Sequence, residues 1–260
     1  MNTSDNSRDP TRSNNMKRGS PLSSVMLMPL SKRRKLTTDR VKTSSNPNQQ
    51  SHRSPLGKDL PDPAQNHTPL QFLQELFHSM YGISLEVRPA RELKDFFQPS
   101  SDEETAAYTT ELLSVVRENN VLKLKQLKEE KNVNLRCRNQ FGESLVHLCC
   151  RRGFAETFKF LLEEEGAPVR ISDDCGRNPL HDTCWNATPQ LEICQQLMER
   201  DPALFLVSDS RGFTPFDYAR AQHWGTWKQF LLDHRHHLQA LAQDRETLRR
   251  FSSLPVLNKL

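Results

Sequence analysis

The chain has 260 residues, with 36 Lys or Arg against 32 Asp or Glu, and a formal net charge of +4. Residues 1–60 hold twelve basic and four acidic residues, so they carry +8 and residues 61–260 carry −4. The excess positive charge belongs to the N-terminal part, and it is poor evidence that the rest of the chain binds nucleic acid. No stretch approaches about 18 consecutive apolar residues, so we expect neither a transmembrane helix nor a membrane partner.

The N-terminal part lacks the residues that build a core. Residues 1–71 contain no Phe, Tyr or Trp and hold eight of the sixteen prolines. Such a segment cannot bury enough apolar surface to offset the entropy that it would lose on ordering. We therefore predict that residues 1–66 form a disordered basic tail.

Two basic clusters in this tail, separated by thirteen residues, resemble a nuclear import signal. We expect an import receptor to bind them and the protein to be nuclear, with the cytoplasm as the alternative location. The competing interpretation is a charge run that only keeps the chain soluble or attracts nucleic acid or anionic lipid. Ser20 and Ser54 precede prolines, and a phosphate on either would weaken the local positive field. The clusters are Lys17 and Arg18, then Lys32, Arg33, Arg34 and Lys35.

The six cysteines all lie between residues 137 and 194, and no secretory signal precedes them. The apolar stretch "VMLMPL" at 25–30 is too short for the core of a signal peptide and is broken by Pro29. We expect an intracellular, reduced protein with free thiols rather than disulfides.

Apolar periodicity begins near residue 68. Thr68 suits a helix cap and Pro69 the first helical position, and apolar residues follow at three- and four-residue steps over 70–80. This pattern predicts a helix over 68–80, within a flanking helix and connector at 67–104. The sequence "SDEE" at 101–104 fits a capping box and predicts one further helix over 103–118.

Three glycines then recur with similar surroundings. Gly142, Gly176 and Gly212 are spaced by 34 and 36 residues, within "NQFGESLVHLCCRRG", "DDCGRNPLHDTCWNA" and "DSRGFTPFDYARAQH". Each copy starts with a polar turn and continues into a short helix, and a second helix follows after a loop. A weaker copy lies upstream, where "ENNVLKLKQLKEEKNVN" aligns with "RRGFAETFKFLLEEEGAPV". The spacing predicts a tandem array of helix pairs.

These motifs resemble the ankyrin repeat family, with "PLH" at 179–181 and "TPFD" at 214–217 as the closest matches to its T-P-L-H motif. The resemblance implies an all-α solenoid of helix-turn-helix units with hairpin loops, over residues 105–235. It comprises three full repeats and a degenerate N-terminal unit. Such units must stack to bury their apolar faces, and polar-faced elements should close the ends. We expect flanking helices at 68–80, near 103–118 and around 228–250 to do so, with residues 236–260 as a C-terminal helix and tail.

His147 and His181, with Cys150 and Cys184, raise the alternative of a zinc site. Each pair is one repeat apart, which in stacked helices means about 8–10 Å, whereas two ligands of one zinc ion lie only roughly 4 Å apart. The resemblance implies instead that the histidines bind backbone groups of adjoining turns and that the small cysteines pack between helices. We therefore expect no bound metal, and we interpret His234, His236 and His237 as polar residues of an exposed helix.

The motifs of common active sites are missing from the sequence, including G-x-x-x-x-G-K-[ST], G-x-S-x-G and H-E-x-x-H. We therefore expect no catalytic residues and no cofactor, and the resemblance implies a non-enzymatic adaptor or regulator that binds a protein partner. In the family the turn residues and the ends of the first helices face the partner. Those positions hold Phe141, Glu143, Arg151, Arg152, Asp174, Arg177, Trp185, Arg211 and Phe213. Two alternatives stay open: a transcriptional regulator whose basic tail binds nucleic acid, and a metal-binding protein.

Overall fold

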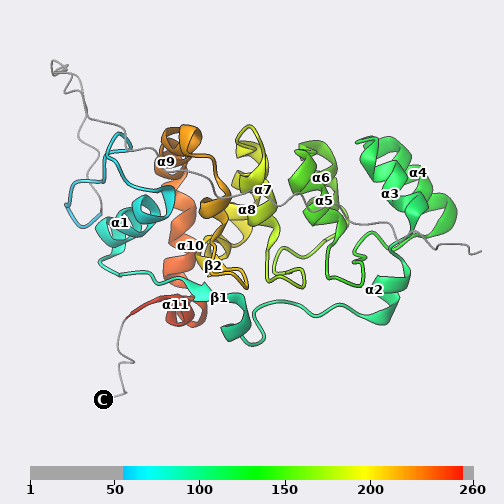
Figure 1. The fold of residues 1–260 in the computed structure, drawn as a ribbon, viewed down its shortest axis with the longest axis horizontal. Helices are drawn as coiled ribbons and strands as arrows, with labels where there is room; N and C mark the ends of the chain where they lie inside the picture. The colour runs from blue at the N-terminus through cyan, green and yellow to red at the C-terminus, as the bar shows by residue number, and fades with distance from the viewer. Residues whose placement is uncertain (1–54, 254–260) are drawn as a thin grey trace, which may run out of the picture. The chain divides into compact units, whose positions relative to one another are not determined.

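A computed structural model describes residues 55–253, and the two basic clusters, Ser20 and Ser54 lie outside the described residues. Helix pairs stand side by side in a row (Figure 1), with first helices packed on first helices and second helices on second helices. The pairs are α3 (Thr110–Arg117) with α4 (Val121–Lys131), α5 (Leu145–Arg152) with α6 (Ala155–Glu163), α7 (Pro179–Trp185) with α8 (Leu191–Arg200), and η3 (Pro215–Tyr218) with α9 (Trp224–Asp233). The row is the predicted ankyrin-type solenoid, and the fold is mostly helical.

Each full repeat begins with the same hydrogen-bonded turn. The backbone N–H of Asp173 donates to Arg177 O at 3.0 Å, and the N–H of Asp209 donates to Phe213 O at 2.9 Å. In both turns the aspartate Oδ1 also accepts two backbone N–H groups, at 2.8 to 3.0 Å. Asn139 makes the equivalent contacts in the first full repeat. A short polar side chain that can satisfy its own turn explains why this position is Asn or Asp.

The glycine of each turn is required by its conformation. Gly142 has φ 78°, in the left-handed region, which L residues with a Cβ rarely adopt. A Cβ there would also lie 2.7 Å from Ser172 O in the next turn. Neighbouring turns are in direct contact, since Asp174 N–H donates to Phe141 O at 2.8 Å. The glycine therefore permits both the bend and the close approach of the next repeat.

Two histidines join successive repeats, as the resemblance implied. Nδ1 of His181 accepts the N–H of Asn178 at 3.1 Å, and Nε2 donates to Phe213 O of the following turn at 3.1 Å. His147 makes the same pair of contacts, with Ser144 N–H at 3.3 Å and Arg177 O at 3.2 Å. Each imidazole thus caps its own helix and fixes the turn of the next repeat.

The segment before the array runs along it in the direction opposite to the order of the repeats (Figure 1). Helix α1 (Pro69–Tyr81) packs on α9 at the far end of the row, and strand β1 (Arg88–Pro89) pairs in parallel with β2 (Val207–Ser208). The chain then passes η1 (Ala90–Glu92) and reaches α2 (Asp102–Ala106) beside the first unit. Hydrogen bonds hold this connector, from Gln98 N–H to Arg170 O at 2.8 Å and from Arg138 Nη1 to Gln98 O at 2.6 Å.

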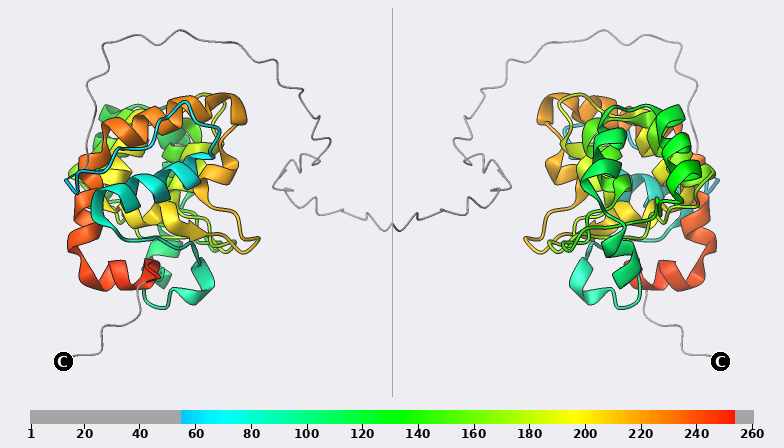
Figure 2. Two further views of the ribbon diagram at one scale, coloured as in Figure 1. Left: turned by 90° about the vertical axis from the view of Figure 1, so that its left-hand side faces the viewer. Right: turned by 90° about the vertical axis from the view of Figure 1, so that its right-hand side faces the viewer.

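The C-terminal segment closes the same end of the array as α1, as Figure 2 shows in its left view. Phe251 is fully buried against Phe96 of the connector, and its carbonyl accepts Glu86 N–H at 2.6 Å. Both ends of the described chain therefore contribute to one cap. Besides α1, the cap contains η2 (Pro202–Leu206), η4 (Ala221–His223), η5 (Arg235–His237), α10 (Leu238–Gln243) and α11 (Arg245–Phe251).

Four expectations differ from the structure. Residues 55–66, assigned to the tail, are placed, because Lys228 Nζ donates to Gln65 O and the partly buried Leu60 packs on the core. The helix expected over 103–118 is divided into α2 and α3, since Thr109 provides a second N-cap. The helix expected around 228–250 is broken into α9, η5, α10 and α11, and Asp244 caps the last of these. "TPFDYA" forms only a 3-10 turn, which ends where Ala219 becomes extended.

The cap makes α1 part of the folded array. Phe77 of α1 has no exposed surface, so we expect Phe77→Ala to lower the free energy of unfolding by about 3 to 5 kcal/mol, measured by urea denaturation. The exposed His78 on the same helix is the control; His78→Ala should change stability by no more than about 0.5 kcal/mol. Equal, small effects would mean that α1 is not held on the array.

Among residues 55–253, no helix combines the length and the apolar character needed to cross a membrane.

Candidate protein-binding surface

Seven of the nine predicted contact residues are exposed on the turns and at the ends of the first helices, whereas Glu143 and Arg177 are partly buried. Among the described residues, five large apolar side chains are exposed, and Phe141, Trp185 and Phe213 are three of them, with 52%, 44% and 40% of their surface exposed. The other two are Leu56 and Leu122, outside the repeat turns and first helices. Because large exposed apolar side chains often mark interaction sites, these three are candidate contact points, and Trp185 and Phe213 lie together around Tyr218.

Three predicted residues meet around Tyr218, and we call Trp185, Phe213, Tyr218 and Arg211 the aromatic cluster. Trp185 stacks on Tyr218 with ring centroids 5.9 Å apart and planes at 26°, and Phe213 meets Tyr218 edge to face at 6.4 Å. The Arg211 guanidinium lies over both Phe213 and Tyr218, at 5.2 and 5.7 Å from the ring centroids. The cluster brings together side chains from a turn and from the first helices of two repeats.

Tyr218 is not among the contact residues predicted from the sequence. It stands six residues after Gly212, as Asp182 stands six residues after Gly176. Asp182 lies on α7 and Tyr218 on η3, which are the first helices of successive repeats. The equal distance from the turn glycine could therefore have identified Tyr218 from the sequence. The Tyr218 hydroxyl donates to Asp209 Oδ2 at 2.6 Å and contacts Arg211 Nη2. Tyr218 therefore links the turn to the stacked rings.

A second group surrounds Arg151. Its guanidinium pairs with Glu143 and lies 3.3 Å from Asp182 Oδ1, through Nε. Asp182 is on α7, three residues before Trp185, so this group continues toward the aromatic cluster. Arg177 instead pairs within its own turn, with Nε donating to Asp173 Oδ2 at 2.7 Å.

Four predicted residues stay outside both groups, and Arg177, which pairs with Asp173, is one of them. Phe141 and Asp174 lie at neighbouring turn tips and are joined only through their backbones. Arg152 is exposed at the end of α5 and forms no ion pair with any other described residue. The nine predicted positions therefore do not form one continuous patch.

Burial shifts the pKa values of several side chains on and beneath this face. Loss of solvent raises the pKa of the Asp182 carboxyl to about 7, although Arg151 acts in the opposite direction. Burial also opposes ionisation of Glu143, but Arg151 outweighs it and lowers the pKa of that carboxyl. The buried imidazoles of His147 and His181 have pKa values lowered to about 4, so both are neutral near pH 7.

The contacts of His147, His181, Cys150 and Cys184 do not suit metal binding. Both ring nitrogens of His147 and His181 are engaged by the backbone and by helix caps. Burial raises the pKa of the Cys150 and Cys184 thiols well above the usual range, which disfavours the thiolates that zinc binds. Packing between helices accounts for these buried residues.

Among residues 55–253, one group of three potential ligands lies close together, formed by Asp173, Asp174 and Cys175. Asp173 already accepts two backbone N–H groups and the Arg177 guanidinium. The exposed Cys175 thiol has a pKa raised by burial and by the adjacent carboxylates. This group does not fit a cation, because its main carboxylate is saturated.

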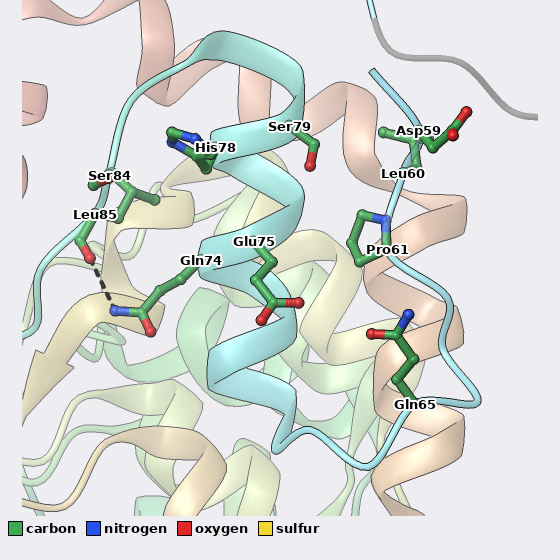
Figure 3. A pocket seen from close by; sticks show the side chains of 10 residues that line it. All are labelled: Asp59, Leu60, Pro61, Gln65, Gln74, Glu75, His78, Ser79, Ser84 and Leu85. Carbon is green, nitrogen blue, oxygen red and sulfur yellow. Dashed lines mark hydrogen bonds between the residues drawn. The ribbon is translucent and has the colours of Figure 1, made fainter.

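A cavity of about 670 Å³ lies away from the contact residues, between residues 59–65 and α1 (Figure 3). Its lining includes Glu75 and His78, and Gln74 Nε2 donates to Leu85 O at 2.9 Å across it. Glu75 is paired with His67 at 2.8 Å. Within the lining, neither Ser79 nor Ser84 is hydrogen-bonded to the His78 imidazole.

The shifted groups on this face predict how stability depends on pH. Folded Asp182 takes up its proton near pH 7 and unfolded Asp near 4, so acidification between these values stabilises the fold. The two histidines have the opposite effect, since they protonate near pH 6.5 only when unfolded. Asp182→Asn should therefore enlarge the loss of unfolding free energy between pH 7 and pH 5 by about 2 kcal/mol, measured by urea denaturation at both pH values.

The control for this experiment is Glu143→Gln, which removes the other carboxylate paired with Arg151. Because the pKa of Glu143 is lowered, it is ionised in both states across this pH range, and its loss should leave the pH dependence nearly unchanged. An Asp182→Asn protein with the wild-type pH dependence would show that the Asp182 carboxyl titrates below pH 5.

Comparison with known proteins agrees with the geometry. A family model described as ankyrin repeats (3 copies) matches residues 112–206. A segment of 105 residues is 28% identical to the human SMC5-SMC6 complex localization factor protein 1, and it covers 40% of this chain and 10% of that protein. The match therefore spans about a tenth of the length of that relative. Ankyrin repeats are protein-interaction modules, and the turns, the spacing and the family match together establish that this chain contains an array of ankyrin repeats.

Proposed function

We propose that the protein is a non-enzymatic adaptor or regulator that binds another protein through the face formed by its repeat turns and first helices. The observation that carries this proposal is the aromatic cluster. Trp185 and Phe213 are exposed although the same repeats bury most of their other large apolar side chains. Aromatic and arginine side chains are the types that most often dominate binding energy at protein interfaces.

The rigidity of the cluster also favours binding. Trp185 is held by Tyr218, which is hydrogen-bonded to the buried Asp209. An anchor already fixed in place loses little conformational entropy when a partner packs against it. The turn that carries both Arg211 and Phe213 is fixed by the Asp209 side chain, which accepts the backbone N–H groups of both residues. The partner therefore meets a preformed surface.

We further propose that the adaptor acts in the nucleus and that Lys17, Arg18 and the cluster at 32–35 form its import signal. The similarity to a protein named as a localization factor of a complex is compatible with a role in positioning other proteins. Binding of the basic tail to nucleic acid is the alternative. Its affinity would fall linearly with added salt on logarithmic axes.

Trp185→Ala tests the anchor. We expect affinity capture from the native cell to lose the specific partners, while the melting temperature falls by no more than about 4 °C, because only one exposed ring stack is removed. The control is Leu122→Ala, which removes a side chain that is 73% exposed on α4. Retained partners would show that Trp185 is not the anchor, and a large loss of stability would show that it is structural.

Replacement of Lys32, Arg33, Arg34 and Lys35 by alanine tests the proposed nuclear import signal. We expect a fluorescent fusion of the full chain to move from the nucleus to the cytoplasm, since the import receptor would lose its main contact. A fusion with Lys17 and Arg18 replaced distinguishes a two-part signal from a single cluster. An unchanged nuclear signal in the combined variant would contradict the proposal.

A further inference from the structure

The charges on the binding face are arranged by depth. Three aspartates lie inside, with side chains of Asp173, Asp182 and Asp209 exposed by 3%, 6% and 0%. The arginines paired with them lie outside, and Arg177, Arg151 and Arg211 are exposed by 21%, 42% and 55%. A partner arriving from solvent therefore meets guanidinium groups and aromatic rings before it meets these carboxylates.

In two of these carboxylates, those of Asp173 and Asp209, both oxygens accept hydrogen bonds. Oδ1 of Asp209 accepts the N–H groups of Arg211 and Phe213, and its Oδ2 accepts the Tyr218 hydroxyl. Asp173 is engaged in the same way by its turn and by Arg177. A cationic partner side chain would find no unoccupied oxygen on either residue, which disfavours a basic segment at the aromatic cluster.

Arg211 keeps unused hydrogen-bonding capacity. Its Nη2 contacts the Tyr218 hydroxyl and lies 3.5 Å from Asp209 Oδ2, which is long for a charged pair. Its Nε and Nη1 form no hydrogen bond with any other described residue. A guanidinium offers five N–H donors in a planar fork that matches a carboxylate. The exposed edge of Arg211 can therefore take a second acidic group.

The surface beside Arg211 is apolar. Trp185 and Phe213 contact Tyr218 and keep 44% and 40% of their own surface exposed. A partner residue that packs here removes aromatic surface from water and strengthens the neighbouring charge pair by desolvating it. The cluster thus combines one apolar contact and one anion contact at a single place.

We infer that the aromatic cluster takes an extended protein segment in which an Asp or Glu stands beside an aromatic or aliphatic residue. The carboxylate pairs with Arg211 and the apolar side chain packs on Trp185. This inference rests on the proposed protein-binding function. A segment with one or two carboxylates suits the site better than a polyanion, because residues 61–260 carry a net charge of −4 that repels many phosphates.

Selection from a random library of 12-residue peptides on phage tests this chemistry. Phage that bind the immobilised full chain are collected after depletion on Trp185→Ala protein, which carries the same basic tail and removes peptides that bind elsewhere. We expect the sequenced pool to be enriched in Asp and Glu next to aromatic or aliphatic residues. For a synthetic peptide from the pool, Arg211→Gln or Glu-to-Gln in the peptide should weaken binding about tenfold or more.

The matched control is Lys159→Gln, which removes one positive charge from an exposed position on α6 and should leave the affinity unchanged. A Trp185-dependent pool that is neutral or basic, or that ignores Arg211→Gln, overturns the inference and leaves the proposed function standing. If no Trp185-dependent pool emerges, both fail. If a single-stranded 20-mer oligonucleotide binds the wild-type chain and loses binding in both the Trp185→Ala and Arg211→Gln proteins, the occupant is nucleic acid and the inference is wrong.

Discussion

The array depends on contacts that each repeat makes with the next, because a pair of short helices cannot bury its apolar face alone. Two kinds of contact meet at this interface. The helices pack through small buried residues such as Cys150 and Cys184, and His147 and His181 bind carbonyls of the following turns. An imidazole in this place must remain neutral, and burial ensures that it does at neutral pH. Packing and turn geometry are thereby fixed by the same few side chains.

A row of repeats also needs its ends covered, and here one end is covered by segments from both ends of the described residues 55–253. Helix α1 packs on α9, and the connector then joins β2 and Phe251 before it returns to the first unit. Parallel pairing of β1 with β2 brings together residues more than a hundred positions apart. The cap therefore holds the connector along the array, and the connector in turn restrains turns near Arg138 and Arg170.

The binding face follows from the turns. An aspartate that saturates its own turn must be buried, and the arginine that neutralises it then points toward solvent, as with Asp209 and Arg211. The same register places Tyr218 and Trp185 on adjacent first helices, so that their rings stack. The buried carboxylate of such a pair thus fixes the turn, and the arginine of the same pair supplies an exposed charge to the proposed binding face. This division explains how a stable array can present arginine and aromatic side chains while Asp173 and Asp209 stay buried.

The sequence by itself determined the repeat unit. A glycine spacing of 34 and 36 residues, the turn aspartates and the helix-starting motifs act within about 35 residues, and local conformation follows from local sequence. The same register predicted Trp185, Arg211 and Phe213 as exposed positions, but it did not point to Tyr218, on which their side chains pack. Only the tertiary structure decided that α1 caps the far end, that residues 55–66 pack against it, and that the expected terminal helices break into pieces. Those outcomes depend on contacts between residues more than a hundred positions apart, as in the pairing of β1 with β2. They also depend on additional helix caps such as Thr109. The apolar periodicity of one segment predicts neither.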